Sequence, residues 1–291
     1  MDEEYRNVWV VFDSEPDAIK GGLWAADTMT NAQFLNTAQI AFRSPGGFVA
    51  RKRGSDAAIE ANDRILEHGY YILSPTIPGC TVEVSNERYY PRTLSLSSTS
   101  RDSTFTHDVR QRDGRCVISG DVNMDAGRNA WVGFQAAHVF PLALSDIFAS
   151  HGFLGTISDS RGVNSPNNGL LLRSDIHQLW DGYYLAVNPD DNYRVYTFKQ
   201  TFCRYHNAVL DPVCRRPVDP HRVFDSLLRW HFEQAVLFNM CGAGEPSFDF
   251  DFPAGRDMMG AIREGPLPAR RMEAELFGRL YSYRESEQSA R

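Results

Sequence analysis

The sequence predicts an α+β protein, in which two short strands and a helix form a central core between an N-terminal α/β module and a C-terminal helical segment. Three patterns indicate this class. Residues 133–138 read as a short strand, which Pro141 ends. An Asn-Gly turn signal begins at Asn168 and opens onto three leucines and a helix that carries His177. Residues 221–240 are apolar at helical spacing, which is typical of a buried helix.

The composition is that of a folded protein of 291 residues, with 42% hydrophobic and 12% aromatic side chains. No apolar run reaches the roughly 18 to 20 residues that cross a bilayer, and the first residues are acidic where a signal peptide is basic. The five cysteines are scattered without a C-x-x-C pair, which fits a reducing compartment. We therefore expect a soluble, intracellular protein of the cytoplasm or nucleus, with no membrane partner.

The charge balance limits how this chain can contact nucleic acid. Its net charge is −7, and no large segment is basic overall. Lysine and arginine contacts to phosphates supply most non-specific affinity for nucleic acid, so the composition argues against a wide binding surface. Any such contact would depend on local arginines, a bound cation, or both.

Residues 1–95 are predicted to form the N-terminal α/β module. The expected elements are strands at 8–12, 70–73 and 81–84 and helices at 29–42 and 55–68. Thr30 or Asn31 is the expected cap of the first helix, and an acidic turn with a proline is expected after the first strand. The serine- and threonine-rich residues 96–104 are the predicted linker to the next module.

Residues 105–200 are predicted to form the central module, and residues 201–291 a C-terminal helical region. Besides the core, the expected elements are helices at 109–112 and 142–150, a β-hairpin of residues 183–187 and 193–198, and helices at 221–240 and 268–283. The hairpin is expected to pack beside the helix of His177. The polar residues 155–166 form a long connection, and loops of this kind are often functional or mobile.

Four short motifs follow one another in the central module. They are Cys116-Val117-Ile118-Ser119-Gly120, Ala136-Ala137-His138-Val139-Phe140-Pro141, Asn168-Gly169-Leu170-Leu171-Leu172 and His177-Gln178-Leu179-Trp180-Asp181. Their order and spacing resemble the HNH endonuclease family, in the branch with the patterns A-x-H-[IV]-x-P, N-G-[LI]-x-L and H-x-[LI]-[FW]-D. Four matches in order are far more specific than any one of them, and they cover about a third of the chain.

The resemblance implies a ββα-metal fold that hydrolyses nucleic-acid phosphodiester bonds, with DNA more expected than RNA. It implies His138 as the general base, because an imidazole can accept a proton from water near neutral pH. It implies His177 as a ligand of one divalent cation, Mg²⁺ or Mn²⁺, with Zn²⁺ as a further option. Asp181 follows four residues later on the same helical face and is a second expected ligand. Asn168 is expected at the catalytic site, either as a metal ligand or as a hydrogen-bonding residue that keeps the strands in register.

One position departs from the pattern of many family members. They carry Asp, Glu or His directly before the general base as a metal ligand, and here that residue is Ala137. The branch that this chain resembles often has a small residue there. The cation would then lack one protein ligand unless Asp175, Asp181 or another side chain supplies it. The alternative to an active nuclease is therefore a catalytically inactive HNH-fold protein that binds a partner or serves as a scaffold.

Basic and thiol side chains near the core give two further hypotheses. Arg110, Arg112 and Arg115 form the best-placed basic cluster and are expected to bind the phosphate backbone of nucleic acid, with ordinary surface charge as the alternative. Two cysteines and two histidines beyond the hairpin could form a rival zinc site, although their spacing is irregular. They are Cys203, His206, Cys214 and His221.

Overall fold

The computed structural model describes residues 6–87, 89–90, 103–148, 151–153 and 161–241. Within these residues the chain is a mixed α+β protein with small sheets and few helices, as the sequence predicts. The helix expected at 268–283 and most of the expected linker at 96–104 lie outside the described residues. In the described part of the chain, no helix is both long and apolar enough to span a bilayer.

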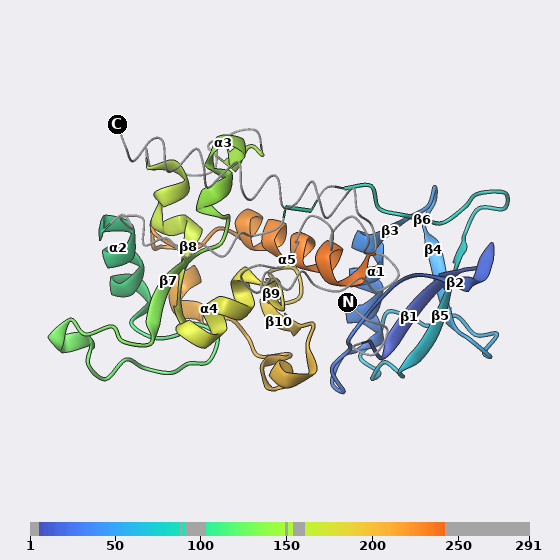
Figure 1. The fold of residues 1–291 in the computed structure, drawn as a ribbon, viewed down its shortest axis with the longest axis horizontal. Helices are drawn as coiled ribbons and strands as arrows, with labels where there is room; N and C mark the ends of the chain where they lie inside the picture. Colours follow the sequence, from blue (N-terminus) through green and yellow to red (C-terminus); the bar gives the residue numbers. More distant parts are fainter. Residues whose placement is uncertain (1–5, 88, 91–102, 149–150, 154–160, 242–291) are drawn as a thin grey trace, which may run out of the picture.

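A four-stranded sheet forms the N-terminal end of the molecule, on the right in Figure 1. Its strands are β1 (Val8–Phe12), β2 (Glu15–Leu23), β4 (Phe48–Lys52) and β5 (Gly69–Pro75), in the order β2-β1-β5-β4. β1 and β5 run parallel, and both were predicted. β2 and β4 were not predicted. β2 is an edge strand and contains Pro16, which the sequence suggested as part of a turn. A proline has no N–H group to donate, but at the edge of a sheet it can face away from the neighbouring strand, so it is compatible with β2.

Helix α1 (Asn31–Ala41) packs against this sheet and confirms the helix predicted at 29–42. The Thr30 hydroxyl accepts a hydrogen bond from Gln33 N at 3.3 Å, and the Gln33 side chain accepts one from Thr30 N at 3.0 Å. This reciprocal capping box identifies Thr30 as the cap. Two short strands, β3 (Phe42–Arg43) and β6 (Glu83–Val84), pair after the helix.

The helix predicted at 55–68 is wrong, because this segment uses its backbone for tertiary pairing. Ile59 N donates to the Ala50 carbonyl of β4 at 2.8 Å. Two carbonyls of the same segment accept the first N–H groups of α1, at 2.9 and 3.0 Å. Ile65, expected on an inner face, is exposed. Tertiary hydrogen bonding outweighs a weak helical periodicity here.

The predicted core of two strands and a helix is present. Strands β7 (Phe134–His138) and β8 (Gly169–Arg173) pair antiparallel and lead into α4 (Ser174–Asp181). Helix α2 (Ser103–Asp113), longer than the predicted helix at 109–112, packs against the other face of the strands. At Gly169 a Cβ would come within 2.6–2.8 Å of Val109 and Phe105 of α2, so only glycine permits this close approach.

The remaining described α-helices and strands, with one 3-10 turn before α3, follow the order predicted for the central and C-terminal parts. They are the 3-10 turn η3 (Leu142–Leu144) with α3 (Ser145–Phe148), strands β9 (Leu185–Asn188) and β10 (Arg194–Thr197), and helix α5 (Asp225–Met240). The β9–β10 hairpin is confirmed. The helix expected at 142–150 is divided into η3 and the short α3.

Helix α5 lies along the middle of the molecule and contributes to two apolar clusters (Figure 1). Its first half, with Leu227, joins the cluster around β7, β8 and α4. Its second half, with Phe232, joins the cluster of the N-terminal sheet. Gln33 of α1 also donates hydrogen bonds to Asp191 at 3.0 Å and to Asn207 at 2.6 Å. The N-terminal sheet is therefore packed against the hairpin and α5.

Candidate active site

His138 ends β7, opposite Gly169 of β8. Its half-buried ring stacks on Phe105 of α2, with centroids 4.1 Å apart and planes within 5° of parallel. Its Nε2 lies 3.2 Å from Oδ1 of Asn164. The Trp180 indole of α4 donates to the His138 carbonyl at 3.2 Å. Both the plane of the imidazole and one of its nitrogens are therefore fixed by neighbours.

The contact with Asn164 assigns the tautomer of the neutral ring. An amide oxygen only accepts hydrogen bonds, so the proton belongs on Nε2. Nδ1 then keeps its lone pair and is the ring atom that can take a proton. Asn164 ends the 3-10 turn η5 (Gly162–Asn164), and Arg161 just before it pairs with Asp108 of α2 at 2.8 Å. Helix α2 thus supports both groups that orient His138.

His177 lies on α4 with each ring nitrogen facing an oxygen. Its Nδ1 is 2.6 Å from Oε1 of Gln135, and its Nε2 is 3.1 Å from Oδ2 of Asp181. The four-residue spacing places His177 and Asp181 on one helical face, as expected. Their side chains are 15% and 27% exposed, so the pair is open to solvent. If Nδ1–H donates to Gln135, Nε2 and the Asp181 carboxylate are two acceptors that face each other across 3.1 Å, an arrangement that a cation bound to both would stabilise.

The His177–Asp181 pair fits two neighbouring ligands of one divalent cation. Two ligands at right angles, each about 2.0–2.1 Å from the ion, lie about 3 Å apart, and the observed separation is 3.1 Å. Gln135 is the kind of outer partner that fixes the orientation of a histidine ligand. Within the described residues, no group of three or more His, Cys, Asp or Glu side chains is arranged for a metal. Water or substrate oxygens would have to complete the coordination of such a cation.

Side chains alternate along β7, and this sorts the site residues by face. Ala136 and His138 face α2, whereas Gln135 and Ala137 face α4. Ala137 is buried in an apolar cluster, and its methyl group supplies no ligand. Gln135, two residues earlier on the same face, is the β7 side chain that reaches His177.

Asn168 is fully buried, and its side chain is occupied by the backbone. Its Oδ1 accepts from Phe140 N at 2.7 Å, and its Nδ2 donates to the carbonyls of Phe140 and Val163, both at 2.9 Å. Its own carbonyl accepts from Val139 N at 2.8 Å. These bonds join the chain after β7 to the chain before β8. The geometry therefore favours the hydrogen-bonding role for Asn168 over metal ligation.

The structure corrects the expectation that Arg112 binds phosphate. Its side chain is 2% exposed, pairs with Asp113 at 2.6 Å, and donates to the carbonyls of Pro166, His221 and Gly169. Burial acts to lower the pKa of Arg112, but the Asp113 carboxylate more than offsets this, so the pKa is raised and the group stays charged. A guanidinium without solvent access cannot reach a phosphate. Arg112 instead ties α2 to the chain around β8.

The other two predicted arginines lie nearer the surface. Arg110 stacks over the Trp131 ring, with its guanidinium carbon 4.7 Å from the centroid. Arg115 is partly exposed and pairs with Asp211 at 3.3 Å. The ion pair of Arg115 lies at the surface and contributes little stability, so exchanging Asp211 for a phosphate would cost Arg115 little free energy.

The rival zinc site is not assembled. Cys203 is exposed, whereas Cys214 is buried. His206 is buried, its Nδ1 accepts from Thr197 N at 3.3 Å, and burial lowers the pKa of His206 to about 4. None of these residues takes part in a three-residue metal cluster within the described chain.

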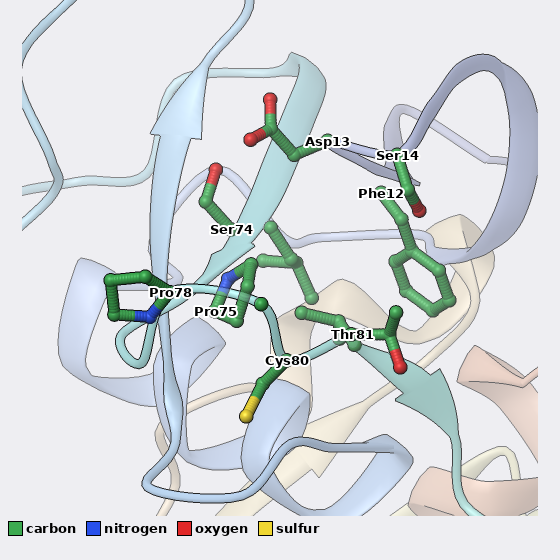
Figure 2. Close-up of a pocket in the computed structure, with 11 residues that line it drawn as sticks. Phe12, Asp13, Ser14, Ser74, Pro75, Pro78, Cys80 and Thr81 are labelled. Carbon is green, nitrogen blue, oxygen red and sulfur yellow. The ribbon is translucent and has the colours of Figure 1, made fainter.

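A separate pocket of about 380 Å³ lies on the N-terminal sheet (Figure 2). It is formed where the parallel strands β1 and β5 end, by residues 12–14, 73–75 and 78–82. Among these lining residues, Asp13 alone is charged. The pocket therefore lacks the paired acid, base or metal ligands found beside β7 and α4, and we place the candidate active site at His138 and His177.

Sequence reasoning missed three side chains that touch the two histidines. They are Phe105, Gln135 and Asn164. Strand alternation could have indicated Gln135, because it shares the face of Ala137. Phe105 and Asn164 carry no such signal, because tertiary packing alone brings them to His138.

Two family models match the chain. One, described as HNH endonuclease, matches residues 116–188, and the other, described as a domain of unknown function (DUF8573), matches residues 5–78. No curated protein and no solved structure matches the sequence. The first match spans all four motifs, confirms the resemblance predicted from them, and indicates nuclease activity on nucleic acid. The second covers most of the N-terminal sheet and α1.

Proposed function

We propose that the HNH endonuclease domain of residues 116–188 makes this protein a metal-dependent endonuclease that hydrolyses phosphodiester bonds, with DNA as the expected substrate. In this proposal β7, β8 and α4 serve as a ββα-metal core. One observation carries it. The same hairpin and helix present His138 with an oriented ring, and His177 with Asp181 at ligand spacing.

His138 acts as the general base in this proposal. Its Nδ1 takes a proton from a water molecule while the water oxygen bonds to phosphorus and the bond to the leaving sugar oxygen breaks. The leaving oxygen takes up a proton from solvent. Asn164 retains the proton on Nε2 and Phe105 holds the ring plane, so the Nδ1 lone pair keeps one direction.

His177 and Asp181 would hold one divalent cation, with Mg²⁺ or Mn²⁺ expected and Zn²⁺ as an option. When bound, this ion offsets negative charge on the phosphate and the leaving oxygen. Gln135 accepts from Nδ1–H of His177 and so directs Nε2 toward the ion. Gln135 thereby orients the ligand His177, on the strand face where Ala137 supplies no metal ligand.

Contacts to the phosphate backbone are proposed for Arg110 and Arg115. With a net charge of −7, the protein is expected to bind nucleic acid weakly and with an affinity that falls as the salt concentration rises.

The proposed function is tested by incubating the purified full-length protein with supercoiled plasmid and with a single-stranded oligonucleotide. We expect cleavage with Mg²⁺ or Mn²⁺ and none with EDTA. Absence of cleavage with every divalent cation would instead favour the alternative function, a catalytically inactive HNH-fold protein that binds or scaffolds a partner.

Asn164 provides a test of how the base is oriented. Leucine keeps the approximate shape but removes the acceptor, and Asn164→Leu is expected to lower kcat by about 10–100-fold with little change in KM. Asn164→Asp keeps an acceptor oxygen and is expected to retain most of the activity. Asn86→Leu, an exposed site in the N-terminal part, is the control. Equal kcat values for Asn164→Leu and Asn164→Asp would contradict this role.

A further inference from the structure

We propose that the loop of residues 121–132 inserts Met124 and Val132 into the minor groove of duplex DNA about four base pairs from the cleaved bond, an inference that rests on the proposed nuclease function. Figure 1 shows this green loop projecting past β7, at the end of the molecule opposite the N-terminal sheet. It leads directly into β7, whose last residue is His138.

The loop places large apolar side chains in solvent. Met124 is 88% exposed and Val132 is 93% exposed, and Val122 of the same loop is also exposed. Isolated apolar residues are common on protein surfaces. Here three of them fall within eleven consecutive residues, in the loop that leads into β7.

Hydrogen bonds hold the two limbs of the loop together. The buried Asn123 donates from Nδ2 to the Ala130 carbonyl at 2.8 Å, and its Oδ1 accepts from Asp125 N at 3.1 Å. Ala130 N donates back to the Asp125 carbonyl at 3.2 Å. Met124 and Val132 therefore extend from neighbouring limbs of a closed loop. Such preorganisation lowers the entropic cost of inserting them.

The charges around these side chains suit a phosphate backbone. Arg110 stacks on Trp131 at the base of the loop. Arg128 is strongly exposed, and its pair with Asp125 at 3.2 Å is a surface pair that contributes little. The other loop carboxylate, Asp121, is compensated by Arg173 at 2.8 Å. Both loop carboxylates are thus paired with an arginine, and Arg128 is the one guanidinium of the loop itself, with Arg110 of α2 at its base.

The size of the apolar surface favours duplex DNA over a protein partner. A stable protein interface buries about 800 Å² per partner, far more than two side-chain tips supply. A groove-binding protein needs only one or two apolar side chains to wedge between base steps. The five residues of β7 span about 13 Å, which corresponds to about four base pairs along a duplex. We therefore place the wedge about that far from the cleaved bond.

The experiment compares Met124→Ser/Val132→Ser with a control, Val218→Ser/Ile65→Ser, which changes exposed apolar residues elsewhere. Both are assayed on duplex DNA and on bis(p-nitrophenyl) phosphate, a small phosphodiester that has no groove. For the loop variant we expect kcat/KM to fall about tenfold or more on the duplex and to stay unchanged on the small ester. The control variant is expected to match the unaltered protein on both.

Several outcomes would contradict the proposed insertion of Met124 and Val132 into the minor groove. Unchanged duplex cleavage is one, and it is also the result expected if the loop serves a protein partner. An equal loss on both substrates is another, because it would mean that the active site itself is disturbed. If the unaltered protein cleaves neither substrate, the proposed function fails. Duplex binding measured by fluorescence anisotropy then tests separately whether Met124 and Val132 insert into DNA. Equal dissociation constants for the loop variant and the unaltered protein would reject it.

Discussion

Replacing His138 with alanine is expected to lower the single-turnover cleavage rate by about 10²–10⁴-fold, the usual contribution of a general base. The fold is expected to persist. The contact with Trp180 uses the His138 carbonyl, which alanine keeps. The imidazole is only half-buried, so its removal exposes one face of Phe105 and frees Asn164 without opening a closed cavity.

The control for this variant is His107→Ala, which removes an exposed imidazole from α2 on the same side of the hairpin. It is expected to cleave at the unaltered rate. If His138→Ala also cleaved at the unaltered rate, His138 would not be the base, and a contaminating nuclease would be the first explanation to examine.

Deleting residues 1–95 is expected to abolish the folded state of the remaining chain. The deletion would uncover apolar side chains of the β9–β10 hairpin, of the residues that flank it and of α5, all of which belong to the apolar cluster of the N-terminal sheet. They are Tyr183, Ala186, Tyr196, Phe198, Phe232, Ala235, Val236 and Met240. Exposing one large side chain costs about 1.5–3 kcal/mol, so the six large side chains of this set amount to about 9–18 kcal/mol, which is comparable to the roughly 5–15 kcal/mol that stabilises a typical domain. Thermal unfolding followed by circular dichroism measures the effect.

Co-expression of residues 1–95 with residues 96–291 as separate chains provides the control, and it is expected to restore a soluble complex. A soluble fragment 96–291 that unfolds cooperatively on its own would contradict the shared core. If that fragment also cleaved faster than the intact protein, the N-terminal part would be an inhibitory module.

Local patterns predicted the parts of the fold that depend on local forces. The run of β-branched and aromatic residues in β1 and the turn signal before β8 identified both strands. The cap at Thr30 is a property of four consecutive residues and could also be read from the sequence. The spacing of His177 and Asp181 on one helical face followed from helix geometry alone.

The failures have tertiary causes. Residues 55–68 have helical spacing, but they pair with β4 and α1. Arginine is a residue type that usually lies at the surface, but Arg112 is buried because Asp113 and three backbone carbonyls bind its guanidinium group. The contacts of His138 with Phe105 and Asn164 join residues 33 and 26 positions apart. A sequence pattern can indicate which residues carry chemistry, but the groups that orient them depend on packing.

The central claim is that two histidines of one hairpin and helix have separate roles, proton acceptance at His138 and cation binding at His177. The most direct measurement is Mn²⁺ binding, followed by electron paramagnetic resonance, and cleavage of a duplex by the same preparations of the unaltered protein, His138→Ala and His177→Ala. We predict that His138→Ala binds Mn²⁺ as tightly as the unaltered protein but does not cleave, whereas His177→Ala loses both properties. Unchanged Mn²⁺ binding and cleavage in His177→Ala would contradict the account.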